Sequence, residues 1–149
     1  FFSDFTVFEN LNFFQSFFDK DNKSRKKSII SSIEKLNLSN FYKQKFKFLS
    51  SGEKKKMSII RALLRKPKVL LLDEYSLSLD MKSRYEIKKE IFDLNKNNKT
   101  TIIQSTHLLE DIVGTSNKLM LLNDKGLEEK LISINVSFKD LKEVVIDGR

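Results

Sequence analysis

The chain has 149 residues, of which 40% are hydrophobic, so it is long enough to bury the core of one ordinary domain. It contains no cysteine, which excludes disulfides and thiolate metal sites, and its central apolar run, Val69 to Leu72, is far shorter than the about 20 residues of a membrane-spanning helix. The 28 Lys and Arg outnumber the 20 Asp and Glu and give a net charge of +8, which we interpret as solvated surface charge, so no specific nucleic-acid partner is expected.

The first third of the chain is predicted to be helical. Thr6 and Glu9 fit a capping box, in which the hydroxyl and the carboxylate each satisfy an amide at a helix start. Apolar residues then recur at helical spacing as far as Phe18. A second helix is predicted from about Lys23 to Leu36.

A further capping box, formed by Ser50 and Glu53, predicts a helix that runs to about Arg65 and ends before Pro67. Its basic residues are interpreted as the solvated face of the helix. The residues predicted to form its buried stripe are Met57, Ile60 and Leu64.

Val69 to Leu72 is a continuous apolar run, which is typical of a strand covered on both faces in a parallel sheet. The run ends on two adjacent carboxylates, Asp73 and Glu74. Ser83 and Glu86 are then predicted to cap a third helix. The residues predicted to form the buried face of this helix are Ile87, Ile91 and Leu94.

A turn is predicted at Asn97 and Asn98, and the next strand, Thr100 to Ser105, leads to His107. The following helix is predicted to be short and to stop near Gly114. Strands that alternate with helices in this way predict an α/β fold with a parallel sheet.

The end of the chain carries weaker patterns. Residues 118–122 are predicted to form a strand and residues 123–126 a turn, whereas the tail 127–149 has no assignment. We therefore expect a helical subdomain over about residues 1–48 and an α/β core over about residues 49–126.

Three side chains fall at the carboxyl ends of predicted strands, where open α/β sheets bind their ligands. Asp73 could hold Mg²⁺ and Glu74 could polarise an attacking water, although such a pair also commonly starts a turn or caps a helix. His107 could donate to a terminal phosphate, although a single histidine is more often a surface residue.

Ser50, Ser51 and Gly52 open the helix that starts after Leu49. The first amides of a helix lack intrahelical partners and the dipole there is positive, so this terminus could bind phosphate. The alternative is an ordinary helix cap.

Four motifs in this order resemble those of the ATP-binding cassette (ABC) family. Leu49 to Glu53 resembles the signature LSGGQ, and Val69 to Glu74 resembles the Walker B strand with its catalytic glutamate. Ser78 to Asp80 resembles the D-loop, and Ser105 to His107 resembles the switch-histidine loop. The stretch from Asp4 to Phe14 resembles the start of the helical subdomain in exporter-type cassettes.

The resemblance implies a RecA-like P-loop NTPase fold and an ATPase that uses ATP and Mg²⁺. Asp73 would serve Mg²⁺, Glu74 would be the general base and His107 would contact the γ-phosphate. The nucleotide would be held across a head-to-tail dimer with a second cassette. The residues that the resemblance places on that nucleotide are Ser50, Ser51, Gly52, Glu53 and Asp80.

The sequence also departs from the family pattern. Ser51 replaces a glycine, Glu53 replaces glutamine, and Tyr75-Ser76 replaces Pro-Thr, which predicts a less rigid turn. A phosphate loop needs two glycines five positions apart, whereas the four glycines here are at least twelve positions apart. The chain therefore resembles the C-terminal part of a cassette that lacks Walker A, and we expect it to be inactive alone and to expose an apolar sheet edge.

Three functions fit these features. The first is the ATP-binding subunit of an ABC exporter at the cytoplasmic face of a membrane, whose Phe-rich segment, Phe8 to Phe18, would meet transmembrane subunits. For those aromatic residues, packing in the core is the alternative. The second function is a soluble ABC ATPase of translation, DNA repair or iron–sulfur assembly, and the third is an inactive, truncated remnant.

Overall fold

The computed structural model describes residues 1–124, 126–132 and 137–146. The chain divides into two compact units, Phe1–Gln104 and Ser105–Arg149. None of the helices in the described ranges combines the length and the apolar character needed to cross a membrane.

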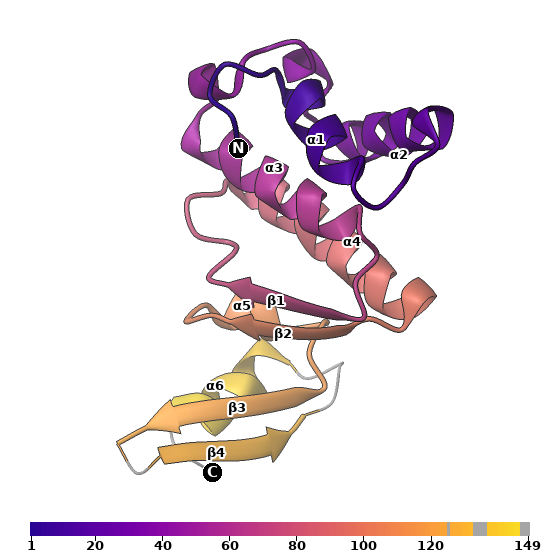
Figure 1. Cartoon of the computed structure of the whole chain (residues 1–149). Coiled ribbons are helices and arrows are strands. Elements are labelled where there is room, and N and C mark those ends of the chain that lie inside the picture. Colours follow the sequence, from indigo (N-terminus) through magenta and orange to yellow (C-terminus); the bar gives the residue numbers. More distant parts are fainter. Residues whose placement is uncertain (125, 133–136, 147–149) are drawn as a thin grey trace. The chain divides into compact units, whose positions relative to one another are not determined.

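The first unit begins with helical structure, as predicted. The elements up to residue 63 are α1 (Val7–Gln15), α2 (Asn22–Lys35), the 3₁₀ turns η1 (Ser39–Phe41) and η2 (Phe46–Phe48), and α3 (Ser51–Leu63) (Figure 1). Helix α1 is shorter than expected and ends before Phe17 and Phe18, which are exposed.

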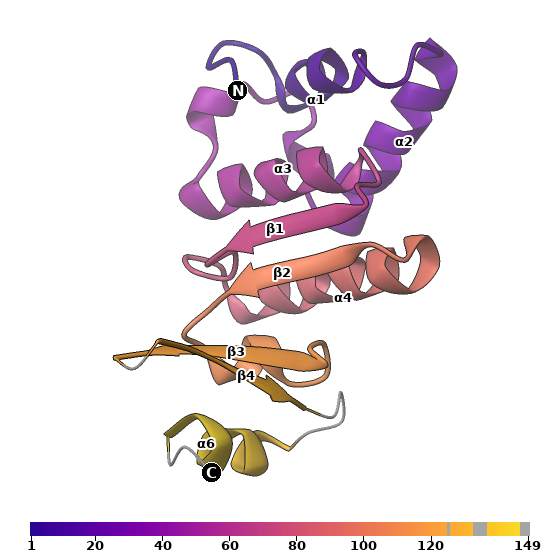
Figure 2. The ribbon, with the colours of Figure 1, turned by 60° about the horizontal axis from the view of Figure 1, so that its bottom comes forward.

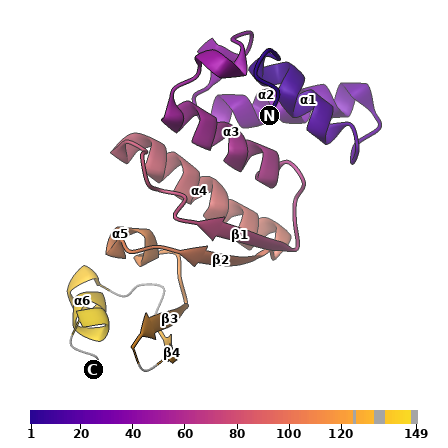
Figure 3. The same ribbon diagram turned by 60° about the vertical axis from the view of Figure 1, so that its left-hand side comes forward.

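An α/β arrangement follows. Strand β1 (Val69–Asp73), helix α4 (Met81–Asn98) and strand β2 (Thr101–Ser105) come next in the chain. The two strands pair with each other and run in the same direction (Figure 2). Helices α3 and α4 lie between the α1–α2 pair and these strands (Figures 1 and 3). The predicted α/β fold with parallel strands and a preceding helical segment is therefore confirmed.

One apolar cluster joins the elements of the first unit. Helix α3 contributes Met57 and Ile60, which are fully buried as predicted, whereas Leu64 lies just after the helix and is half-buried. The buried face predicted for α4 is also confirmed. Its members are Ile87, Ile91 and Leu94.

Both predicted capping boxes form. The Thr6 hydroxyl accepts from the Glu9 amide, and the Ser50 hydroxyl accepts from the Glu53 amide. Helix α2 begins one residue earlier than predicted because the Asp21 carboxylate caps it. Short polar side chains at these positions satisfy amides that the helix itself leaves without partners.

Helix α4 differs from the prediction at both ends. Ser83 is not its cap: Asp80 Oδ1 accepts from the Ser83 amide at 2.8 Å, so the helix begins at Met81. Aspartate and serine are comparably good caps, but both Asp80 oxygens accept from Ser83, which places the start of the helix at Met81. The turn expected at Asn97 and Asn98 is also wrong, because the helix continues through them and the left-handed residue is Lys99, at φ 53°.

Strand β1 is covered on one face, not on both as predicted. Leu70 and Leu72 are buried, whereas Val69 and Leu71 are 55% and 70% exposed. Ile103 on β2 is similarly exposed, at 55%. A run of four apolar residues does not reveal how many faces of the sheet are covered, and in this chain α3 and α4 lie against one face (Figure 3).

The second unit starts with α5 (Leu109–Ile112), which stops before Gly114 at φ 74°, as predicted. Strands β3 (Lys118–Asn123) and β4 (Gly126–Leu131) form an antiparallel hairpin. Of the predicted turn 123–126, Lys125 lies outside the described residues.

The tail after residue 126 contains more structure than the sequence predicted. Besides β4 it includes α6 (Phe138–Ile146), and Leu141 of α6 packs in a small core with Ile112 and Leu119. Residues 133–136 and 147–149 of this tail lie outside the described residues.

Candidate functional site

The N-terminus of α3 carries the predicted phosphate-binding residues. The Ser50 amide donates to Glu53 Oε2 at 2.7 Å, while the Glu53 amide donates to Ser50 Oγ at 3.3 Å. Glu53 therefore uses its carboxylate in the cap of its own helix. Ser50 and Ser51 are exposed at the tip of this helix, so both can be reached from outside.

Gly52 brings two distant parts of the sequence together. A β-carbon placed on Gly52 would lie 3.5 Å from the carbonyl oxygen of Ser78 and 3.8 Å from Cδ2 of Leu79. The start of α3 thus packs directly on the segment that leads into α4. The signature-like and D-loop-like motifs are neighbours in space, which the spacing in the sequence does not show.

Asp80 has a structural role at the start of α4. Its two carboxylate oxygens accept from the Ser83 amide at 2.8 Å and from the Ser83 hydroxyl at 2.7 Å. These hydrogen bonds, the one from the hydroxyl first, hold the pKa of Asp80 below its ordinary value, and the Lys56 cation lowers it further. Asp80 therefore presents an exposed, ionised carboxylate beside Ser78.

Asp73 and Glu74 lie at the carboxyl end of β1, and both are exposed. Glu74 has φ 40°, in the left-handed region, which is uncommon for residues other than glycine and is often found at functional sites. Tyr75 and Ser76 are buried, and the Leu77 amide donates to the Glu74 carbonyl at 3.2 Å. The turn after Glu74 is therefore anchored in the core, and the expectation that it is less rigid than a Pro-Thr turn stays a prediction.

The described residues contain no group of three or more His, Cys, Asp or Glu side chains arranged to hold a metal ion. Asp73 offers a carboxylate, which is the type of ligand that Mg²⁺ prefers.

His107 lies in the second unit, two residues after the end of β2, and is exposed. The Thr106 hydroxyl donates to Asp111 Oδ2 at 2.7 Å and accepts from the Leu108 amide at 3.0 Å, so it fixes the turn that contains His107. Glu74 belongs to the first unit, and the expected meeting of the His107 and Glu74 side chains stays a prediction.

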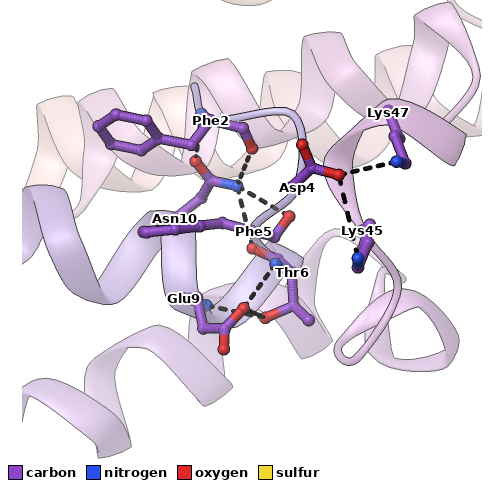
Figure 4. A network of polar contacts seen from close by, with 8 residues as sticks. All are labelled: Phe2, Asp4, Phe5, Thr6, Glu9, Asn10, Lys45 and Lys47. Atoms are coloured by element: carbon purple, nitrogen blue, oxygen red, sulfur yellow. Dashed lines mark hydrogen bonds and ion pairs between the residues drawn. The ribbon is translucent and has the colours of Figure 1, made fainter.

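Near the N-terminus, a network around Asn10 holds the segment before α1 in place (Figure 4). The buried Asn10 amide accepts from the Phe2 amide at 2.8 Å and donates to the carbonyls of Phe2, Phe5 and Thr6. Asp4 in the same segment pairs with Lys47 at 2.7 Å. Asn10 therefore holds the backbone at Phe2 and Phe5, and Lys47 holds Asp4, which lies between them in the chain.

Four phenylalanine rings form a continuous exposed row, which we call the aromatic strip. Its members, in order of contact, are Phe5, Phe2, Phe13 and Phe17. Successive ring centroids are 4.9, 5.0 and 5.3 Å apart, and the exposed fractions range from 38% to 60%. Packing in the core therefore does not account for these four residues, although it does account for Phe8, which packs on Tyr42 and the main cluster.

One buried cation, Lys56, was not predicted from the sequence. Lys56, interpreted as part of the solvated face of its helix, is only 9% exposed. Its ammonium donates to the Leu36 carbonyl at 3.1 Å and to Glu86 Oε2 at 3.4 Å. The local signal was the spacing: Lys56 lies four residues before Ile60 of the buried stripe, and residues four apart share a face of a helix.

Comparison with known proteins identifies the family of the chain. A family model described as "ABC transporter" matches residues 1–77. The spermidine/putrescine import ATP-binding protein PotA of Desulfitobacterium hafniense (strain Y51) is 32% identical over 123 residues, which cover 83% of this chain and 35% of PotA. PotA of Mycoplasma capricolum is 32% identical over 134 residues, covering 86% of this chain and 38% of PotA. The chain thus spans somewhat more than a third of these relatives.

Solved structures show the same fold. A metal-chelate type ABC transporter in an inward-facing conformation aligns with a TM-score of 0.71 and 25% identity, over 95% of this chain and 60% of that one. The dimeric ABC transporter cassette MJ0796 aligns with a TM-score of 0.77 and 23% identity, over 87% of this chain and 58% of that one. By its cassette fold and by a family match over just over half of its residues, this chain belongs to the ABC transporter family.

Proposed function

We propose that this chain is part of the ATP-hydrolysing subunit of an ABC transporter, and that it works at the cytoplasmic face of a membrane. The observation that carries the proposal is the contact of Gly52 with Ser78 and Leu79, because it joins the signature-like and D-loop-like motifs in one surface. The ATP-binding names of the PotA relatives support the same function.

Import is the direction that the relatives favour. The sequence led us to expect an exporter, on the resemblance of residues 4–14 to exporter-type cassettes. Two curated relatives that match most of this chain are named import ATP-binding proteins. We therefore replace the expected exporter with an importer.

Within this function, Asp73 is assigned to Mg²⁺, Glu74 to the general base and His107 to the γ-phosphate. The exposed carboxylates at the end of β1 support the first two roles. When bound, Mg²⁺ would neutralise charge on the phosphates of ATP. Glu74 would hold the attacking water and accept its proton.

The second nucleotide-binding surface consists of Ser50, Ser51, Gly52, Glu53 and Asp80. We assign it to ATP held by a second cassette, because Ser50 and Ser51 are exposed at a helix N-terminus, where anions bind well. The related cassette MJ0796 forms a dimer bound to ADP and Pi in one solved structure, and this supports a paired arrangement.

The aromatic strip is assigned to the transmembrane subunits. A continuous row of exposed rings is unusual on a surface that faces only water, and it favours a transporter over a soluble ATPase of the same family. Residues 1–48, which contain the strip, would form the helical subdomain, and residues 49–126 would form the nucleotide-handling core.

The test is ATP hydrolysis by the intact transporter that contains this subunit. Glu74→Gln is expected to lower kcat by about 100-fold or more while nucleotide binding persists, because the amide cannot accept the proton of water. Glu34→Gln, at an exposed position of α2, is the matched control and should leave kcat unchanged.

Full activity of Glu74→Gln would refute the assignment of the general base. We also expect residues 1–149 alone to bind Mg-ATP poorly, since the sequence contains no phosphate loop. Calorimetry that gave micromolar Mg-ATP binding to this chain would contradict that expectation.

A further inference from the structure

Three helices of the first unit meet at the Lys56 side chain. Lys56 belongs to α3, and its ammonium donates to the carbonyl of Leu36, directly after α2, and to the carboxylate of Glu86 on α4. The Lys56 and Glu86 side chains are only 11% and 14% exposed. One nearly buried cation thus bonds to two other helices.

The end of α2 is shaped to receive this cation. Asn37 adopts φ 53° and the Leu38 amide donates to the Ile33 carbonyl at 2.9 Å, which closes the helix with a left-handed residue. The Leu36 carbonyl then lacks an amide of its own helix, and Lys56 donates to it. A cation is favoured at this negative end of the α2 dipole.

Glu86 is the third member of this contact, which we call the junction: the Lys56 ammonium, the Leu36 carbonyl and the Glu86 carboxylate. Its Oε1 accepts from Asn37 Nδ2 at 2.6 Å, while its Oε2 faces the Lys56 ammonium at 3.4 Å. Without Glu86, the nearly buried Lys56 cation would have no carboxylate partner in this contact, which is unfavourable. The positions of Lys56 and Glu86 therefore depend on each other.

The junction lies behind the surface assigned to the nucleotide. Lys56 is six residues after the cap Ser50, and Glu86 is six residues after the cap Asp80. The same two helix starts touch where Gly52 packs against Leu79. The ion pair between Lys56 and Glu86 joins α3 to α4 six residues after their caps, so it also restrains the relative position of the two capped ends.

We propose that Lys56 is a positioning residue: clamped between the Leu36 carbonyl and the Glu86 carboxylate, it holds the signature-like helix start against the D-loop-like segment and ties both to α2. This role rests on the proposed function and extends it. Lys56 would be the residue that keeps the signature-like helix start and the D-loop-like segment in fixed positions relative to each other. Because Lys56 is nearly buried, we assign it no contact with the nucleotide or the reacting atoms.

The test is nuclear magnetic resonance on the 149-residue chain, without nucleotide. The observed signal is the cross-peak between the Gly52 α-protons and the Leu79 δ2 methyl group, whose carbon lies 3.8 Å from an ideal Gly52 β-carbon. Lys56→Met, which keeps the length but removes the charge and the donors, is expected to lose this cross-peak. It is also expected to speed amide exchange of Glu53 and Ser83 by about tenfold or more.

Two further variants separate positioning from general stabilisation. Lys56→Arg keeps a cation that can donate to both partners and should restore the cross-peak. Lys35→Met removes the ion pair of Lys35 with Glu90, at 2.8 Å, which also joins α2 to α4 but is more exposed. This control should keep the cross-peak, even where it lowers the melting temperature.

A folded Lys56→Met chain that kept the cross-peak and its exchange rates would overturn the proposal. So would a Lys35→Met chain that lost the cross-peak to the same extent. If Lys56→Met does not fold, Glu86→Gln decides: it keeps an acceptor for Asn37 but not the charge, and an unchanged cross-peak there would overturn the proposal. The result does not depend on ATP hydrolysis, so the proposed function stands or fails separately.

Discussion

A β-carbon on Gly52 would lie 3.5 Å from the Ser78 carbonyl oxygen, which is an ordinary van der Waals contact. The glycine is therefore not required for this chain to fold. Gly52→Ala is expected to leave the melting temperature unchanged or to raise it, because alanine is favoured over glycine in a helix by up to about 1 kcal/mol. Thermal unfolding followed by circular dichroism measures this.

If the proposed function is right, the same substitution adds a methyl group to a surface that a second cassette must approach. Gly52→Ala should then weaken ATP-dependent pairing of the intact subunit, measured by sedimentation. The larger Gly52→Val would also press on Leu79 and lower the melting temperature. A large loss of stability in Gly52→Ala would show that the space near Ser78 is smaller than the structure indicates.

Ser50 is expected to stabilise α3 through its cap. Ser50→Ala removes the hydroxyl that accepts from the Glu53 amide, and this should lower the free energy of unfolding by about 1 kcal/mol. Ser51→Ala, one residue further and exposed, is the control, with an expected change within about 0.5 kcal/mol. Urea unfolding of the two variants gives the comparison, and equal effects would contradict the role of the cap.

Asp80 is expected to link stability to acid pH. Its pKa is held below the ordinary 3.8 in the folded chain, so its contribution to stability is complete above pH 3.8 and is lost as the pH falls through the lower, folded-state pKa. Ser83→Ala removes the hydroxyl that is the largest single cause of this shift and should raise the pKa of Asp80.

The titration of the Asp80 carboxyl carbon by nuclear magnetic resonance measures this pKa directly. Ser58→Ala is a control of the same chemistry, because the Ser58 hydroxyl donates within α3 to the Lys54 carbonyl. An Asp80 midpoint that did not rise in Ser83→Ala would show that the hydrogen bond at 2.7 Å does not control the pKa.

Asn10 is expected to be essential for the structure around the aromatic strip. Asn10→Asp keeps the shape of the side chain but replaces the amide that donates to the Phe2, Phe5 and Thr6 carbonyls. Three carbonyls would then face a carboxylate, which should lower the free energy of unfolding by about 3 kcal/mol or more.

The matched control is Asn40→Asp, at an exposed position, with an expected change within about 0.5 kcal/mol. Urea unfolding measures both. A small effect of Asn10→Asp would mean that the network in Figure 4 contributes little to stability.

Neighbouring leucines of β1 are expected to respond differently to truncation. Leu70 is 5% exposed and belongs to the main core, so Leu70→Ala should cost about 2–5 kcal/mol. Leu71 is 70% exposed, and Leu71→Ala should cost less than about 1 kcal/mol. Equal losses in urea unfolding would show that both faces of β1 are buried, as the sequence alone suggested.

Much of the fold could be predicted because its signals are local. The capping boxes of α1 and α3 depend on side chains three residues apart, and the buried faces of α3 and α4 follow the helical period. For the same reason the strands at residues 69–73 and 101–105 were found within one residue of their observed ends. In the candidate site, the sequence correctly placed Asp73 and Glu74 at the end of a strand and Ser50 at a helix cap.

Other features depend on which elements meet, and there the sequence was insufficient. The local sequence around Lys56 is that of a solvated helix face, yet the side chain is buried because the end of α2 and Glu86 on α4 both lie within reach. Strand β1 has an apolar run suited to two covered faces, but α3 and α4 cover one. The approach of Gly52 to Ser78 likewise joins positions far apart in the chain.

The sequence by itself therefore determined the helices, the strands and the residue types available for chemistry, since propensity, capping and periodicity act over a few neighbouring residues. Only the tertiary structure decided which of these residues share a surface and which cation is buried, because packing between helices sets the distances between groups that are separated along the chain.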